Sequence, residues 1–224
     1  MLSNVYLYYV LDLWVEKWRK KSARGDVIVV RYADDFVLGF QNHDEAVQFL
    51  EDLRERLEKF GLALHPDKTR LIEFGRFAAE NRKKRRQGKP ETFDFLGFTH
   101  MCAKTQTGRF IVKRKTISKR LRAKLKEVKT ALMRTRHQSV GETGVWLRAV
   151  VQGYFNYHAI PGNMECLEAF RTQIIRAWYR ALRRRSQRTR LNWERFRRFV
   201  DLWIPRPRIR HPYPNDRFYA KHPR

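Results

Sequence analysis

The stretch "VIVVRYADDFVLGF", residues 27–40, places two adjacent acids, Asp34 and Asp35, between two strongly apolar runs. Runs rich in Val, Ile and aromatic residues are typical of buried β-strands, and the polar break between them indicates a tight turn. The stretch therefore predicts a hairpin of two strands, 27–32 and 35–40, with both acids at its turn.

Two neighbouring carboxylates repel each other and resist desolvation unless a cation neutralises them. Hard oxygen ligands suit Mg²⁺, and phosphoryl or nucleotidyl transfer uses carboxylates to hold two such ions. The simpler alternative is that Asp occurs at turns because it tolerates turn geometry. The apolar strands on both sides of the pair, and Tyr32 just before it, favour a metal site.

The charge of the chain is distributed unevenly. Its 224 residues carry a formal net charge of +26. Residues 1–75 hold 11 basic and 13 acidic residues, whereas the rest holds 38 basic and 10 acidic residues, a net charge of +28. A partner with dense negative charge explains this excess, and nucleic acid is the usual one, with an anionic membrane surface as the alternative.

Two cysteines, Cys102 and Cys166, lie far apart in the sequence and form no zinc-binding pattern. They fit a reducing compartment and predict a cytoplasmic protein. No run of 18 apolar residues occurs, so no membrane span is expected.

Hydrophobic periodicity predicts an α+β front part. Helices are expected over 4–20 and from Asp44 to about Gly61, further strands over 69–74, 94–100 and 108–114, and a basic loop over 80–90.

The chain reads as helical from Lys115 onwards, with apolar stripes at helical spacing and basic residues on the other faces. Such helices suit a surface that tracks phosphates. The aromatic residues of "GYFNYH" (153–158) lie at helical spacing, which favours a place in the core over base stacking.

Several stretches together resemble one known family. "YADD" inside an apolar hairpin resembles the palm of reverse transcriptases, as do "LHPDKTRLIEFGRFA" (64–78) and "FDFLGFTH" (93–100). Later stretches resemble the maturase-specific domain of bacterial group II intron-encoded reverse transcriptase/maturases, among them "WLRAVVQGYFNYHAIPGN" (146–163) and "WIPRPRIRHPYPNDRF" (203–218).

The resemblance implies three regions: a partial palm with an antiparallel sheet and helices over 1–110, an all-α thumb and maturase bundle over 111–204, and a Pro/Arg-rich tail over 205–224. It implies RNA-directed DNA polymerase activity and RNA splicing in a mobile genetic element. The implied partners are group II intron RNA, an RNA template–DNA primer duplex and an upstream polypeptide that supplies the fingers and the rest of the palm.

The resemblance also implies roles for single residues. Asp34 and Asp35 would be catalytic and would ligate Mg²⁺, and Lys68 would act on the leaving group, although a surface lysine is an equal alternative. Nucleotide and primer contacts would come from Tyr32, Ala33, Phe95, Leu96 and Gly97. An ordinary core strand with a bulge glycine is the alternative for 95–97.

The RNA-binding residues would be basic side chains of the helical part: Arg120, Lys124, Arg183, Arg184, Arg185, Arg188 and Arg190. The densest patch is "RRRSQRTR" (183–190), and such charge runs are often only solvated faces.

The family's polymerase domain begins with fingers and a first catalytic aspartate, for which residues 1–26 offer no acid in a strand context. The two-metal site is therefore expected to be incomplete, and the chain by itself inactive in polymerisation. Three hypotheses remain: one half of a split reverse transcriptase, a non-catalytic RNA-binding module that assists splicing, or a non-functional remnant of a mobile element.

Overall fold

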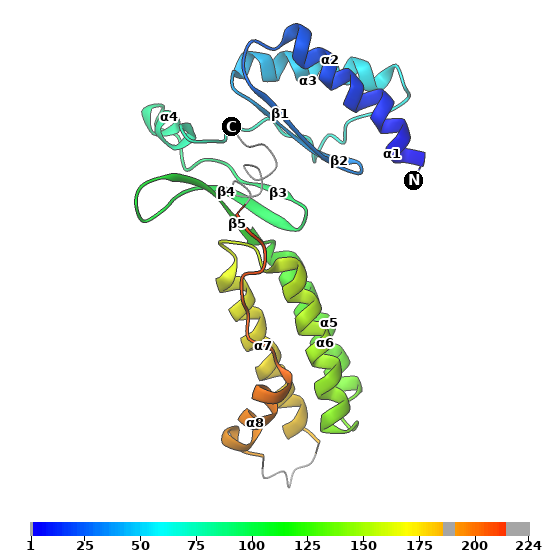
Figure 1. The fold of residues 1–224 in the computed structure, drawn as a ribbon, viewed down its shortest axis with the longest axis vertical. Coiled ribbons are helices and arrows are strands. Elements are labelled where there is room, and N and C mark those ends of the chain that lie inside the picture. Colours follow the sequence, from blue (N-terminus) through cyan, green and yellow to red (C-terminus); the bar gives the residue numbers. More distant parts are fainter. Residues whose placement is uncertain (1, 186–190, 214–224) are drawn as a thin grey trace. The chain divides into compact units, whose positions relative to one another are not determined.

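The computed structural model describes residues 2–185 and 191–213, which fold into two compact units that divide between Phe74 and Gly75. The architecture is α+β, with helices and two small antiparallel sheets among the described residues (Figure 1). The expected fold class is confirmed at this level. The functional division at 110 and 204 stays a prediction.

The N-terminal unit packs helices on one face of a two-stranded sheet. Its elements are α1 (Leu2–Leu7), the π-helical turn η1 (Tyr8–Asp12), α2 (Leu13–Ser22), β1 (Val27–Tyr32), β2 (Asp35–Phe40) and α3 (His43–Glu58). The strands pair from Val27↔Phe40 to Tyr32↔Asp35. Both predicted strand ranges of the hairpin are confirmed.

The hairpin is buried on one face only, so the expectation of buried strands holds for that face alone. Val27 belongs to the core with Phe49, Leu53 and Leu57 of α3. On the other face Ile28, Val30 and Tyr32 are 65%, 47% and 66% exposed. Successive side chains of a strand point to opposite faces, and helices cover only one of them here.

The C-terminal unit joins a three-stranded sheet to a set of helices. Its elements are α4 (Ala78–Lys84), β3 (Phe93–Phe95), β4 (Phe98–Lys104), β5 (Phe110–Thr116), α5 (Ser118–Arg134), α6 (Val140–His158), α7 (Met164–Arg183) and α8 (Trp193–Trp203). The strand order is β3-β4-β5, all antiparallel.

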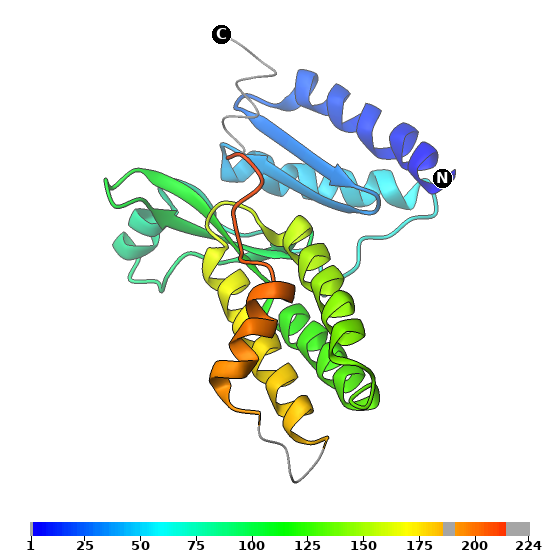
Figure 2. The same cartoon turned by 60° about the horizontal axis from the view of Figure 1, so that its bottom comes forward.

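Apolar residues of α5, α6, α7 and α8 form one core. Its fully buried members include Leu147, Phe170, Trp178 and Phe196. Periodicity predicted that Trp146, Ala149 and Tyr157 would belong to the buried stripe of α6, and this was wrong: they are exposed, and Leu147, Val151 and Phe155 are buried instead. Ser139 and Glu142 form a capping box that satisfies the first N–H groups of α6. Figures 1 and 2 show α5, α6 and α7 running up and down beside one another.

Three local expectations were wrong. Residues 69–74 form no strand, and the basic segment expected to be a loop holds the short helix α4. Residues 94–100 form no single strand but contain a two-residue turn between β3 and β4.

No described helix is long and apolar enough to cross a membrane.

Two glycines of α6 provide a matched test of the packing between α6 and α8. A Cβ on Gly144 would lie 2.6 Å from the Trp203 ring, whereas a Cβ on Gly153 would meet nothing within 4 Å. We expect Gly144→Ala to lower the free energy of unfolding by about 1–3 kcal/mol through overpacking. Gly153→Ala should raise it by about 0.5–1 kcal/mol through helix propensity. Urea unfolding measures both, and stabilisation by Gly144→Ala would contradict the close packing of α6 against Trp203.

Candidate functional site

The turn of the β1–β2 hairpin consists of Ala33 and Asp34, closed by the pair Tyr32↔Asp35. Ala33 has φ of 56°. Tight hairpin turns need a positive φ at the first central residue, normally supplied by glycine or asparagine. The left-handed conformation costs a residue with a Cβ about 1–2 kcal/mol, so the surrounding structure must hold this turn.

The carboxylates of Asp34 and Asp35 are exposed at this turn. Within residues 2–185 and 191–213, neither side chain has a hydrogen-bond or ion-pair partner. Their oxygens are therefore free to accept a hard cation such as Mg²⁺. The described residues form no cluster of three or more His, Cys, Asp or Glu that could hold a metal ion.

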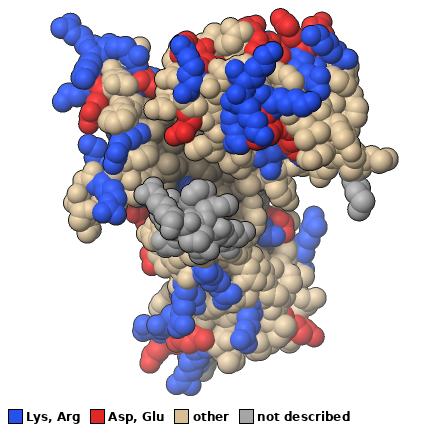
Figure 3. Space-filling view, turned by 45° about the horizontal axis from the view of Figure 1, so that its top comes forward, with Lys and Arg blue, Asp and Glu red and all other residues tan. Residues whose placement is uncertain are grey.

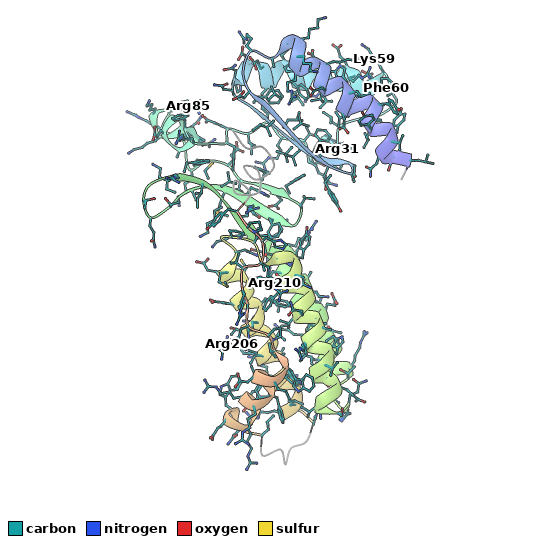
Figure 4. The ribbon with its side chains drawn as sticks, viewed as in Figure 1. Arg31, Lys59, Phe60, Arg85, Arg206 and Arg210 are labelled. Carbon is teal, nitrogen blue, oxygen red and sulfur yellow. The ribbon has the colours of Figure 1, made fainter. Side chains whose placement is uncertain are left out.

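Arg31 holds the strained turn through a hydrogen bond to its backbone. Its Nε and Nη2 donate to the two carboxylate oxygens of Asp12 at 2.7 and 2.6 Å, and its Nη1 donates to the carbonyl of Ala33 at 2.8 Å. Figure 4 shows Arg31 between the hairpin and the N-terminal helical run. The hydrogen bond to Asp12 raises the pKa of Arg31 above its usual value, so its charge is permanent.

Lys68 lies in an exposed turn after α3, where its backbone N–H donates to the His65 carbonyl at 3.2 Å. The contacts described for the N-terminal unit do not join its side chain to Asp34 or Asp35. Its role at the leaving group stays a prediction.

Phe95 ends β3 and pairs with Phe98, and Leu96 and Gly97 form the two-residue turn between β3 and β4, so Gly97 is not a bulge in a continuous strand. Leu96 and Gly97 have φ of 47° and 82°. The Leu96 carbonyl accepts a hydrogen bond from the Tyr157 hydroxyl at 2.8 Å, and the Gly97 carbonyl accepts one from the Ile117 N–H at 3.1 Å. The predicted primer-contacting turn is thus docked onto α5 and α6.

A cavity of about 500 Å³ lies beside this turn. Its lining combines cationic, aromatic and small residues: Arg120, Lys124, Ala149, Val150, Gly153, Tyr154, Tyr157 and His158. Two of the predicted RNA-binding residues, Arg120 and Lys124, are thereby brought together. Lys124 also pairs with Glu127 at 2.7 Å.

The aromatic residues of "GYFNYH" divide between core and cavity. Tyr154 and Phe155 are buried, as expected, but Tyr157 is 52% exposed. His158 stacks on Tyr154 with ring centroids 4.0 Å apart. Burial raises the pKa of Tyr154 to about 12 and lowers the pKa of His158, which the charge of Arg120 lowers further.

The second predicted RNA-binding patch lies at the other end of the helical unit. Arg183 and Arg184 are exposed at the C-terminal end of α7, far from the start of α5 in Figures 1 and 2. Arg185 is half-buried and donates to the Gln138 carbonyl at 2.5 Å, which fits a structural role. Arg188 and Arg190 lie outside the described residues.

A third group of basic side chains surrounds α4, which contains Arg82, Lys83 and Lys84. The space-filling view shows Lys and Arg side chains gathered over this segment (Figure 3).

The described start of the tail, 205–213, follows the helices. The Arg210 N–H donates to the Ala159 carbonyl at 2.9 Å, and the Arg171 Nε donates to the Pro205 carbonyl at 3.0 Å.

Sequence reasoning missed Arg31, Asp12 and Asn163. A charged residue inside the apolar run "VIVVRY" was the available signal for Arg31. Asn163 is fully buried. Its Nδ2 donates to Thr116 Oγ1 and to the His158 carbonyl, and its Oδ1 accepts a hydrogen bond from the Thr116 N–H. These hydrogen bonds tie the sheet to α6 and α7. No periodic pattern marks such a residue.

Acidification provides a test of the cavity. Burial lowers the pKa of His100 and of His158 in the folded protein, so the unfolded chain binds more protons once the pH falls below about 6.5. The free energy of unfolding should therefore decrease from about pH 7.5 to about pH 5.5. His158→Phe keeps a ring for stacking and should make that decrease smaller, as measured by urea unfolding. His137→Gln, at an exposed histidine, is the control and should leave the decrease in the free energy of unfolding unchanged. An equally large decrease in His158→Phe would contradict the burial of His158.

Comparison with known proteins adds one finding. No curated protein matches the chain, but residues 1–100 match the family model of reverse transcriptase (RNA-dependent DNA polymerase). The match includes the β1–β2 turn with Asp34 and Asp35, and it ends just after the turn at Leu96 and Gly97. The first 100 residues are thus similar to a reverse transcriptase domain, and the two site turns lie within this part.

Proposed function

We propose that the chain is part of a group II intron reverse transcriptase/maturase, which combines RNA-directed DNA synthesis with intron RNA binding. The observation that carries this proposal is the pair of exposed carboxylates on a hairpin turn, inside the segment that matches reverse transcriptases. Residues 2–185 and 191–213 provide no hydrogen-bond or ion-pair partner for either carboxylate. A turn that served only to reverse the chain would not require two like charges in a strained conformation.

Asp34 and Asp35 would hold Mg²⁺ through their free carboxylate oxygens, which are the ligands that this ion prefers. When bound, Mg²⁺ stabilises the attacking and leaving oxygens of nucleotidyl transfer. Tyr32 pairs with Asp35 across the sheet and is 66% exposed, so its ring is available to a primer end or nucleotide on the same face. Lys68 would neutralise charge on the leaving group.

The helical unit would bind RNA and a template–primer duplex. Arg120 and Lys124 place two cations beside the exposed Tyr157 ring and the docked turn at Leu96 and Gly97. Cations that bind phosphates beside an aromatic ring that stacks on a base form a common nucleic-acid site. The exposed Arg183 and Arg184 provide a second contact at the other end of the unit.

A non-catalytic RNA-binding module that assists splicing is the second candidate. It is favoured by the concentration of positive charge in the C-terminal part and by the lack of a three-ligand cluster among the described residues. Primer extension by the purified chain with Mg²⁺ and nucleotides separates the two candidates. We expect no extension by the chain alone, and extension on addition of a polypeptide that supplies the remaining palm ligand.

Asp34→Asn tests the metal site directly. One of two anionic ligands becomes neutral, so the affinity for Mn²⁺, used as a spectroscopic substitute for Mg²⁺, should fall by more than about tenfold. Electron paramagnetic resonance titration measures the free ion. Asp26→Asn, at the opposite end of the same hairpin, is the matched control and should bind Mn²⁺ like the unchanged chain. Equal affinity of both variants would rule out a metal site at the turn.

A double substitution tests the cavity as a nucleic-acid site. Arg120→Ala with Lys124→Ala should weaken binding of an RNA–DNA duplex by about tenfold and make its salt dependence shallower, because phosphate contacts are lost. Fluorescence anisotropy at several salt concentrations measures both. The matched control is Lys126→Ala with Lys129→Ala, which lie on α5 but line a different cavity. If the control loses as much affinity as the test variant, binding does not depend on the cavity beside Leu96 and Gly97.

A further inference from the structure

The N-terminal helical run contains a π-helical turn that ends at Asp12, the residue that binds Arg31. Residues Tyr8–Asp12 form η1, in which Val10 and Leu11 are almost fully buried. A π-turn is rare and interrupts the regular helical hydrogen bonds, and it is frequently found at functional sites. Here the Val10 carbonyl accepts a hydrogen bond from Arg56 Nε at 3.1 Å, so α3 holds the irregular turn.

Asp12, at the end of η1, is positioned to receive Arg31. The two side chains are 29% and 16% exposed, so their bidentate pair is partly shielded from water. Arg31 also donates to Asn4 Oδ1 at 3.3 Å. A single guanidinium thus joins α1 and η1 to the Ala33 carbonyl in the hairpin turn.

The position of Arg31 in the strand makes this contact informative. Its cross-strand partner is Phe36, on the same face as Val29 and Leu38, which pack against the helices. A charged side chain on the core side of a sheet is unfavourable unless it is paired and hydrogen-bonded. Its hydrogen bonds end at Asp12, Asn4 and the backbone of the strained turn, which lies next to Asp34.

We propose that Arg31 is a positioning residue that, with Asp12 as its anchor, holds the Ala33–Asp34 turn in its left-handed conformation and so sets where the carboxylates of Asp34 and Asp35 lie. The proposal rests on the proposed metal site at these carboxylates. In this proposal Arg31 would act on the position of the carboxylates and not on the ion. It acts through the Ala33 carbonyl, so its effect depends on the strain at Ala33.

Arg31→Lys is the main test, because lysine keeps the charge but cannot form the planar bidentate pair and reach the carbonyl as well. We expect about tenfold weaker Mn²⁺ binding by paramagnetic resonance titration, the loss typical of removing a group that orients a metal ligand. Amide hydrogen exchange at Asp34 and Asp35 should become faster. Arg54→Lys, an exposed arginine paired with Glu51, is the matched control and should change neither.

Ala33→Gly separates a positioning role of Arg31 from a purely structural one, because it would restore Mn²⁺ affinity only if Arg31 acts through the strained turn. Glycine adopts the left-handed conformation without strain, so the turn needs less support. Arg31→Lys combined with Ala33→Gly should regain several-fold of the lost Mn²⁺ affinity. Asp12→Asn, which leaves the bond from Arg31 to Ala33, should give a smaller loss and serves if Arg31→Lys does not fold.

The outcomes separate this proposal from the metal site on which it rests. If Asp34→Asn abolishes Mn²⁺ binding while Arg31→Lys and Asp12→Asn bind Mn²⁺ normally, the positioning role of Arg31 is refuted and the metal site stands. If Asp34→Asn leaves the Mn²⁺ affinity unchanged, the metal site is refuted. Amide hydrogen exchange at Asp34 then still tests the positioning role of Arg31, because an unchanged exchange rate in Arg31→Lys refutes it. Equal losses with and without Ala33→Gly would show that Arg31 acts on general stability, not on the turn.

Discussion

The guanidinium of Arg31 lies on the core side of a two-stranded sheet, where a charge without a partner would be costly. Asp12 neutralises it from the π-helical turn, and the Nη1 group of Arg31 donates to the Ala33 carbonyl. Because the left-handed turn at Ala33 is strained, the placement of Asp34 and Asp35 depends on this network. A two-stranded sheet has little stability of its own, so the helical run is also what keeps the hairpin folded.

The second turn, at Leu96 and Gly97, uses a different solution. Both residues have positive φ, and their carbonyls accept hydrogen bonds from Tyr157 and from the start of α5. The turn is held by helices that also carry Arg120 and Lys124. In the proposed function, contacts to a primer and to phosphates would therefore come from one rigid arrangement, whereas the metal ligands belong to the other compact unit.

Periodicity predicted the elements whose burial follows a simple repeat. The strands 27–32 and 35–40 were found at their predicted bounds, and the predicted stripe of α7 lies in the helical core. On α6 the predicted stripe was mostly wrong, because the buried face is shifted to Leu147, Val151 and Phe155. The failures have local causes. Residues 69–74 are apolar enough for a strand but find no pairing partner, and "FLGF" hides a turn because Leu96 adopts a conformation that leucine rarely takes. The π-turn has no sequence signature at all.

The sequence by itself determined the character of the hairpin turn, because two adjacent carboxylates between apolar strands repel each other and favour a bound cation. It also determined the basic character of the helical part. Only the tertiary structure decided which of those residues meet. It brought Arg120 and Lys124 to one cavity, placed Arg183 and Arg184 at the opposite end and used Arg185 within the fold. It also joined Asp12, Arg31 and Ala33, since such contacts depend on how helices and strands pack, which no local pattern of residues specifies.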